Sequence, residues 1–385
     1  MLVAAGRDPG RFEGAVNAPV FRASTVLSPS WGDWLDKKAR QKEGEPGFYY
    51  GRVGTPTSQA LLEAVAAIEG GTAAYAYPSG LAACAGAILA LAGSGDHVLM
   101  VDTVYGPVRR LAGGLLKRMG IETTFFDPRA GGAVEELFRP NTRVVYVESP
   151  GSQSMEVMDI PAIAAVARKH DAHTILDNTW AALTFFSPFD KGVDVSVHAA
   201  TKYIVGHSDA VVGLAIVNER ANAAVRTTAL DLGQTVSPDD AFLALRGLRT
   251  LSVRLARHQT NGLALAEWLD QQPEVSVVNH PALKTSVDHD LWRRDFTGAS
   301  GLFSFELKPK LVPALGAFMD ALEHFCVGAS WGGYESLVLP ARTVRTAPGA
   351  VSRDLIRIHA GLEDTSDLLD DLKAGLLALR RAVEK

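Results

Sequence analysis

Cysteine is scarce in this chain of 385 residues, which contains only Cys84 and Cys326, far apart and outside any CxxC pair. Two such thiols argue against a disulfide framework and a structural zinc site, so we expect reduced thiols in a cytoplasmic protein. His198 and His207 lie nine residues apart without a nearby set of carboxylate and histidine ligands. We therefore expect no metal site.

Long apolar runs are absent as well, because no stretch of the sequence is long enough to span a bilayer. The first residues, MLVAAGRDPGRFEG, lack the basic, apolar and cleavage-site order of a signal peptide. A net charge of −5, with both signs spread along the chain, argues against a nucleic-acid-binding surface. We expect neither a membrane nor a nucleic acid as partner.

What the sequence does contain is an alternation of strand-like and helix-like segments from about residue 60 to about 217. The expected strands are 73–77, 97–101, 122–126, 144–148, 174–177 and 193–198, and the expected helices are 58–69, 80–92, 108–119, 133–138 and 160–170. This order predicts an α/β domain with a largely parallel sheet covered by helices. No GxGxxG follows the first strand, which disfavours a dinucleotide-binding dehydrogenase.

The two flanks of this region follow other patterns. Residues 1–57 are rich in proline, glycine and tryptophan and predict an extended arm that packs on a neighbouring subunit. After residue 246 we expect helices at 247–272, near 313–324 and at 366–383, with strands between them. The predicted organisation is therefore an arm (1–57), a large domain (58–246) and a smaller C-terminal α+β domain (247–385).

The stretch VDVSVHAATKYIVGHSD (193–209) places Lys202 just after an apolar strand, among small residues. A lysine in a loop is by default a solvated surface residue. Three other segments change that interpretation, because each places a polar or aromatic group just after another expected strand.

In AYPSGLAACAG (76–86) a helix begins at Gly80, and free N–H groups at a helix start bind phosphate, although such starts are common. In TILDNTW, Asp177 ends a strand, where it could also cap the loop. In VDTVYGP, Tyr105 follows a third strand, where a core role is the alternative. The carboxyl ends of parallel strands meet at one crevice. A phosphate cradle, a lysine, a carboxylate and an aromatic ring together match the needs of pyridoxal 5'-phosphate (PLP).

The whole chain from about residue 16 to about 364 resembles the PLP-dependent transsulfuration enzymes, the Cys/Met metabolism family, with bacterial cystathionine β-lyases as its nearest members. The motifs that carry this resemblance are NAPVFRASTVLSPS, YYGRVGTPT, SPGSQSMEVMDIPAIA, LDNTWA, HAATKYIVGHSDAVVG, SWGGYESL and LIRIHAGLED. It implies fold type I, the aspartate aminotransferase-like fold, with a mainly parallel seven-stranded sheet. It also implies a homotetramer, a dimer of dimers with shared active sites.

The resemblance further implies a role for each matching residue. It makes Lys202 the Schiff-base lysine and general base, Asp177 the partner of the pyridine nitrogen, and Tyr105 the ring-stacking tyrosine. The remaining residues fall into three groups: Gly80, Leu81 and Thr201 hold the phosphate, Tyr50 and Arg52 reach into a neighbouring subunit's site, and Arg357, Ser330 and Trp331 bind the substrate. The family often has a serine where this chain has Ala199, so one phosphate hydrogen bond is missing or replaced.

The implied activity is α,β-elimination of the thioether amino acid L-cystathionine to homocysteine, pyruvate and ammonia. The SWGGYES motif favours β-elimination, because γ-acting relatives more often carry leucine in place of Trp331 and valine in place of Tyr334. The alternatives are a γ-acting lyase or synthase, a broad cysteine-S-conjugate β-lyase, and a PLP-binding regulatory protein. The last is disfavoured, because Lys202, Tyr105 and Arg357 are all present.

Overall fold

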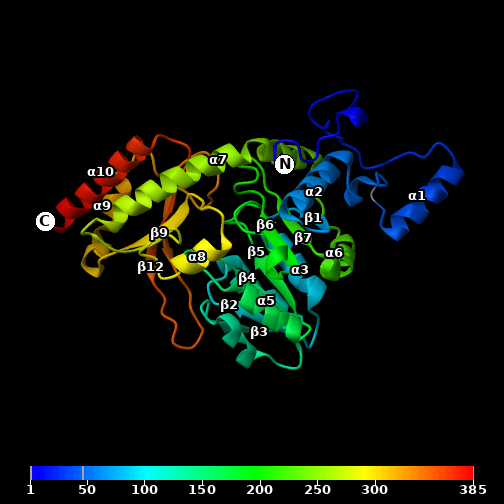
Figure 1. Ribbon diagram of the computed structural model, residues 1–385. Coiled ribbons are helices and arrows are strands. Elements are labelled where there is room, and N and C mark those ends of the chain that lie inside the picture. The colour runs from blue at the N-terminus through cyan, green and yellow to red at the C-terminus, as the bar shows by residue number, and fades with distance from the viewer. Residues whose placement is uncertain (1, 46, 385) are drawn as a thin grey trace.

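The computed structural model describes residues 2–45 and 47–384, and two sheets form the centres of two lobes (Figure 1). The larger sheet has seven strands: β1 (Ala73–Tyr77), β2 (His97–Val101), β3 (Glu122–Phe126), β4 (Thr142–Glu148), β5 (His173–Asp177), β6 (Val195–Ala199) and β7 (Gly213–Val217). Their order is β1-β7-β6-β5-β4-β2-β3. Strand β7 runs antiparallel to both of its neighbours, and the other pairs are parallel. The predicted mainly parallel seven-stranded sheet is confirmed.

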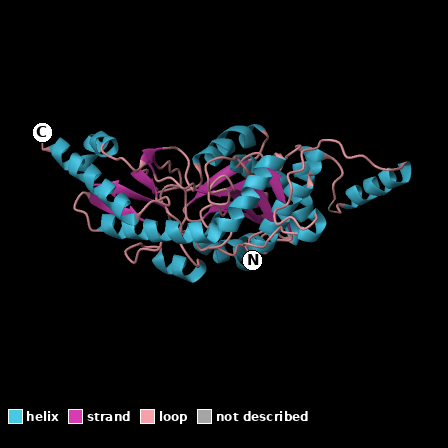
Figure 2. Cartoon of the chain, turned by 90° about the horizontal axis from the view of Figure 1, so that it is seen from above, coloured by secondary structure: helices cyan, strands magenta, loops and turns pink. Residues whose placement is uncertain are grey.

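Helices cover this sheet on both faces, as the view from above shows (Figure 2). They are α2 (Pro56–Glu69), α3 (Gly80–Leu91), α4 (Gly106–Leu111), α5 (Ile160–Lys169) and α6 (Glu219–Asp231). Strands β2 and β7 are buried along their whole length, as expected for strands of a sheet covered on both faces. The alternation of strand-like and helix-like segments in the sequence therefore corresponds to helices that pack on a sheet.

Two of the predicted helices take another form. The expected helix 108–119 is α4 followed by a π-helical turn, Ala112–Leu116, which contains two consecutive glycines that weaken a regular helix. The expected helix 133–138 is a 3-10 segment, Gly131–Leu137, which also begins with two glycines. The six predicted strands agree with the observed ones to within two residues at each end.

Helix α7 (Pro238–Asp270) is 33 residues long and runs from the large lobe into the small one (Figure 1). Its predicted start at residue 247 was wrong, because Ser237 caps the helix by accepting the N–H groups of Asp239 and Asp240, and Pro238 fits the first turn. The proposed domain boundary at 246 thus falls inside one continuous helix. The division into arm, large and small domain stays a prediction.

The second sheet has the order β10-β11-β12-β9-β8. Its elements are β8 (Val275–Asn279), α8 (His289–Asp295), β9 (Leu302–Leu307), α9 (Leu315–Asp320), β10 (Cys326–Val327), β11 (Leu337–Arg342), β12 (Asp354–His359) and α10 (Thr365–Val383). The expected helix near 313–324 is shorter, since a 3-10 segment, Pro309–Ala314, precedes α9. Helices α7 and α10 pack over a separate apolar core that includes Phe303, Phe305 and Phe318.

The N-terminal arm is not wholly extended, because it contains helix α1 (Trp31–Glu43), which projects from the body (Figure 1). None of its residues is buried, and Trp31 and Trp34 stack at 4.9 Å with 70% and 40% of their surfaces exposed. An isolated helix of this length is marginal in water. Its exposed aromatic face supports the expectation that the arm packs on another subunit, which stays a prediction.

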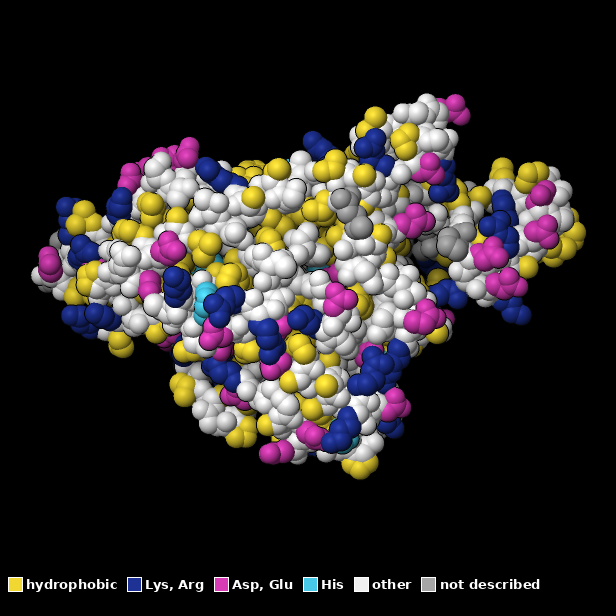
Figure 3. All heavy atoms as spheres, viewed as in Figure 1, with side chains coloured by type: hydrophobic (Ala, Val, Ile, Leu, Met, Phe, Trp, Pro, Cys, Tyr) yellow, Lys and Arg dark blue, Asp and Glu magenta, His cyan; other side chains and the backbone are white. Residues whose placement is uncertain are grey.

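The surface carries charges of both signs, interspersed over the face that Figure 3 shows. Within residues 2–45 and 47–384, no helix combines the length and the apolarity that crossing a bilayer requires.

Candidate active site

A cavity of about 250 Å³ opens at the carboxyl ends of β4, β5 and β6, and residues of the small lobe close it from the other side. Eight of the predicted site residues line it together: Gly80, Leu81, Tyr105, Asp177, Thr201, Lys202, Trp331 and Arg357. A ninth, Ser330, reaches the same place by a hydrogen bond to Lys202. The structure thus brings together residues that are more than 270 positions apart in the sequence.

Lys202 sits in the turn that follows β6, and its Nζ donates a 2.7 Å hydrogen bond to Oγ of Ser330. The same Nζ lies 5.0 Å from the centre of the Trp331 ring. Burial, and next the positive charge of Arg357, lower the pKa of Lys202 to about 8, while the charge of Asp177 acts in the opposite direction. A large share of this amine is therefore neutral just above neutral pH, as a nucleophile or a base requires.

We expect the uptake of PLP by the cofactor-free protein to follow the ionisation of Lys202. Only the neutral amine attacks an aldehyde, so the rate should rise about tenfold per pH unit at low pH and level off above about 8. The rate is measured by the visible absorbance of the bound cofactor, with butylamine as a reference that corrects for the ionisation of PLP itself. Arg357→Leu should shift the midpoint upward, and a midpoint at the value of a solvated lysine would contradict the assignment.

Asp177 is the last residue of β5, and its two oxygens have different surroundings. Oδ1 accepts hydrogen bonds from the N–H and the Oγ1 of Thr179, at 3.1 and 2.5 Å, whereas Oδ2 has only the Cys84 thiol at 3.9 Å. Burial raises the pKa of Asp177, and the Thr179 hydrogen bonds and the charge of His198 lower it. Oδ2 is therefore the atom that could bind the protonated ring nitrogen of a cofactor.

Thr179 was not among the predicted site residues, although the alternative interpretation of Asp177 as a loop cap is also correct. The Thr179 hydroxyl accepts the N–H of Ala199 at 2.9 Å while it donates to Asp177. It therefore locks the Asp177 carboxylate to the turn that leads into Lys202. A threonine two positions after a strand-ending aspartate is the sequence signal that could have identified it.

The start of helix α3 forms a cradle with room for a phosphate but not for a side chain. A Cβ on Gly80 would lie 2.5 Å from the Cβ of Ala199, and a Cβ on Gly213 would lie 2.0 Å from the carbonyl oxygen of Ser79. Ser79 caps only the N–H of Ala82, so the first N–H groups of α3 face the cavity without an intrahelical acceptor. The donor set and its tight packing fit a phosphorylated cofactor.

Thr201 also lines the cavity, but its hydroxyl is engaged elsewhere. Its Oγ1 donates to the carbonyl oxygen of Val212 at 3.3 Å and accepts the N–H of the same residue at 3.0 Å. Its predicted role as a phosphate donor would require that hydroxyl hydrogen to turn away from Val212.

Arg357, on β12, brings a buried positive charge to the cavity, with 6% of its surface exposed. Its Nη2 donates to the carbonyl oxygens of Gly328, Ala329 and Ser330, at 3.1, 3.0 and 3.0 Å. No carboxylate in the part of the chain that the structure describes forms an ion pair with it. Burial lowers the pKa of Arg357. A buried cation of this kind is stabilised by an anion from outside, such as a substrate carboxylate.

Tyr105 stands over the cavity with 43% of its surface exposed, and Glu148, another residue that the sequence analysis missed, holds it there. The N–H of Tyr105 donates to Oε2 of Glu148 at 2.6 Å. Burial, and next the charge of Glu148, raise the pKa of Tyr105, so the phenol keeps its proton near neutral pH. Glu148 pairs in register with Asp177 at the ends of β4 and β5. Its position at the end of an expected strand is the sequence signal that could have identified it as a site residue.

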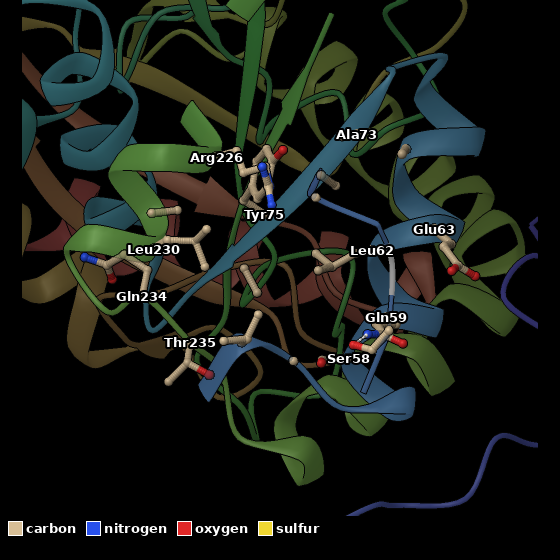
Figure 4. A pocket seen from close by; sticks show the side chains of 18 of the residues that line it. Ser58, Gln59, Leu62, Glu63, Ala73, Tyr75, Arg226, Leu230, Gln234 and Thr235 are labelled. Carbon is tan, nitrogen blue, oxygen red and sulfur yellow. Dashed lines mark hydrogen bonds between the residues drawn. The ribbon is translucent and has the colours of Figure 1, made fainter. Parts of the chain in front are cut away.

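Tyr50 and Arg52 do not reach this cavity within one chain. Nη1 of Arg52 donates to the carbonyl oxygen of Leu230 at 3.2 Å, and its guanidinium lies 5.9 Å from the centre of the Tyr50 ring. Arg52 lines a second cavity of about 380 Å³ under the arm, where labelled side chains of α2, β1 and α6 converge (Figure 4). The two cavities share no lining residue. A role for Tyr50 and Arg52 in a neighbouring subunit stays a prediction.

Comparison with known proteins agrees with this geometry. The sequence model of the Cys/Met metabolism PLP-dependent enzymes matches residues 1–377. Cystathionine beta-lyase MetC of Escherichia coli is 46% identical over 97% of this chain and 96% of its own, and the L-alanine/L-glutamate racemase of Wolbachia pipientis is 39% identical over 98% and 96%. The crystal structure of metB from Corynebacterium glutamicum superposes with a TM-score of 0.88 and 32% identity, over 98% of this chain and 97% of that one. The chain belongs to the Cys/Met metabolism family of PLP-dependent enzymes.

Proposed function

We propose that this protein is a carbon–sulfur lyase that cleaves L-cystathionine by α,β-elimination to homocysteine, pyruvate and ammonia. The observation that carries the proposal is the juxtaposition of Lys202 with the uncompensated charge of Arg357 around one cavity that Asp177 also lines. The name of the Escherichia coli relative, at 46% identity over nearly the full length of both chains, supports the choice of substrate.

The residues of the cavity divide the reaction among them. Arg357 binds the α-carboxylate of the substrate and so directs the Cα hydrogen toward Nζ of Lys202. When bound, PLP supplies an electron sink for the negative charge that develops at Cα. Asp177 Oδ2 would hold the proton on the ring nitrogen of the bound cofactor, and Lys202 would accept the proton from Cα. These roles follow from which groups line the cavity and from their ionisation.

The bond between Cβ and sulfur then breaks, and the leaving sulfur needs a proton. Two groups in the cavity can give one: the ammonium that Lys202 becomes after accepting the Cα proton, and the phenol of Tyr105. Water replaces the amino group of the three-carbon fragment, which leaves as pyruvate and ammonia. One molecule of water and one of cystathionine are consumed for each homocysteine.

The choice of β- over γ-elimination rests on Trp331. Its ring lines the cavity, packs on Tyr203 at 5.4 Å between ring centres and lies beside the Lys202 amine, so it limits where a longer side chain could bend. A γ-elimination requires Cβ as well as Cα to approach the base. Tyr334 does not line the cavity and is 57% exposed, so the part of the sequence argument that used it carries no weight within one chain.

Product analysis separates the proposal from its alternatives. With L-cystathionine we expect stoichiometric pyruvate and homocysteine, whereas γ-elimination would give 2-oxobutyrate and cysteine, and chromatography with mass detection distinguishes the two product pairs. The racemase relative makes amino-acid racemisation the second candidate, because it also begins with loss of the Cα proton. Chiral chromatography of L-alanine and L-glutamate tests it, and racemisation faster than elimination would overturn the lyase proposal.

For the assembly we propose a cytoplasmic homotetramer in which the arm completes a neighbour's active site. The support is that neither Tyr50 nor Arg52 lines the cavity of its own chain and that no residue of helix α1 is buried. A molar mass of four chains by light scattering is expected, and a monomer with full activity would rule the proposal out.

A further inference from the structure

A fully buried polar cluster lies behind the cofactor cavity, and none of the roles above uses it. It consists of Glu69, the last residue of α2, together with Asn178, Ser196 and His198. The side chains of Glu69 and His198 are 0% and 1% exposed, and Asn178 and Ser196 are completely buried. Burying these polar groups costs free energy of folding unless they form hydrogen bonds with one another.

One carboxylate oxygen organises the cluster. Oε1 of Glu69 accepts from Nδ2 of Asn178 at 2.8 Å, from Oγ of Ser196 at 3.0 Å and from Nε2 of His198 at 2.7 Å. Because a carboxylate only accepts, Nε2 of His198 carries a hydrogen. Three donors from two different strand ends therefore converge on a single atom.

Those strand ends lead to two of the predicted cofactor-binding side chains, Asp177 and Lys202. Asn178 directly follows Asp177 on β5, and Ser196 and His198 belong to β6, whose end leads into the turn of Lys202. The backbone pairing of β5 with β6 runs only to Asp177 and Val197, followed by one bond from the N–H of Asn178. The Glu69 cluster continues the connection between the two chain segments beyond the ladder.

We propose that Glu69 is a positioning residue of the cofactor site, which fixes Asp177 and Lys202 relative to each other by binding both strand ends from behind the sheet. The proposal rests on the roles proposed above for these two residues and is independent of which thioether is cleaved. Under this proposal Glu69, at the end of α2, affects cofactor binding without lining the cofactor cavity.

The Glu69 cluster also belongs to the surroundings that shift the pKa of Asp177. Burial is the largest influence on the pKa of Asp177 and raises it, whereas the hydrogen bonds from Thr179 and, after them, His198 lower it. Four further ionisable groups that face Asp177 are Cys84, Tyr105, Tyr146 and Glu148, whose negative forms would oppose its ionisation. Lys202 also faces Asp177, and its ammonium favours the ionised carboxylate.

The same two strands offer a matched control at their other end. Asp194 directly precedes β6, and its side chain is 2% exposed. It accepts the N–H of Thr174 on β5 at 3.0 Å and Nδ2 of Asn218 at 2.9 Å, and it pairs with Arg220 at 3.1 Å. Asp194 is therefore a buried carboxylate that joins the same strands, but far from the cavity that Asp177 and Lys202 line.

The experiment compares Glu69→Gln, Glu69→Ala and Asp194→Asn without any substrate. Each cofactor-free variant is titrated with PLP by visible absorbance, the pH dependence of the bound spectrum is recorded, and thermal unfolding of the cofactor-free form is measured. Glu69→Ala removes the acceptor that three buried donors share and should weaken PLP binding about tenfold or more. Glu69→Gln should bind more tightly than Glu69→Ala but with a displaced pH midpoint, and Asp194→Asn should unfold earlier yet bind PLP within about twofold of wild type.

Two results would overturn the proposal. One is wild-type affinity and an unchanged pH midpoint in both Glu69 variants, and the other is an equal loss of affinity in Asp194→Asn, which would show a general structural effect. If Glu69→Ala does not fold, the isosteric Glu69→Gln decides by its pH midpoint. Because no substrate is present, an error in the proposed lyase reaction would leave these readouts unaffected.

Discussion

Replacing Lys202 with alanine is expected to lower the rate of cystathionine cleavage by at least about 10³-fold and to remove the yellow colour of the protein. The variant loses the proposed general base for the Cα proton and the amine proposed to bond to the cofactor, and no other lysine lines the cavity among the residues that the structure describes. Both effects are measured on the same preparation, by pyruvate release and by visible absorbance.

The matched control is Lys284→Ala, which removes an exposed lysine from the small lobe and should leave rate and colour unchanged. Small primary amines fit the space that the lost side chain leaves, so they should restore part of the activity of Lys202→Ala in proportion to their basicity. Full activity of Lys202→Ala, with or without added amine, would remove Lys202 from the mechanism.

Replacing Arg357 with leucine is expected to lower kcat/KM by about 10²- to 10³-fold, since truncating one partner of a buried charge pair leaves the other unpaired. The substrate carboxylate would then enter a cavity without a counter-charge, and the loss should fall more on KM than on kcat. Steady-state kinetics over a range of cystathionine concentrations separates the two.

Arg357→Lys should recover little of this loss. Nη2 of Arg357 is held by three carbonyl oxygens, while the rest of the planar group remains for the substrate, and a lysine ammonium cannot serve both at once. The control is Arg342→Leu, on the neighbouring strand β11, whose side chain is 69% exposed and pairs only with Asp354. An Arg342→Leu defect as large as that of Arg357→Leu would point to damage of the small sheet instead.

The sequence was sufficient to predict the large sheet and the meeting of Lys202, Asp177 and Tyr105 at its edge. The reason is that apolar runs mark strands and parallel strands deliver their carboxyl ends to one place. Thr179 and Glu148 were not predicted as site residues, because their roles depend on where a side chain points at or just after a strand end. The pairing of Glu69 with His198, 129 positions apart, depends on how α2 packs, which no local pattern records.

Other differences have local causes. The start of α7 was placed too late because the sequence analysis did not use the cap at Ser237 and Pro238. The hydroxyl of Thr201 was expected to be free, yet the neighbouring chain segment at Val212 engages it. In both cases the sequence analysis identified the helix or the residue but not its hydrogen-bond partner.

Helix α7 has a mechanical consequence for the cavity. At about 1.5 Å per residue, its 33 residues form a rod of about 50 Å. Near its middle, Arg254 Nη1 donates to the carbonyl oxygen of Tyr203, beside Lys202, and one turn later His258 Nδ1 donates to that of Ala360, just past β12 and Arg357. The chain segments that carry Lys202 and Arg357 are thus held to adjacent points on one stiff element. Because both contacts lie on one rigid helix, the relative positions of Lys202 and Arg357 are set as the chain folds, before any ligand enters the cavity.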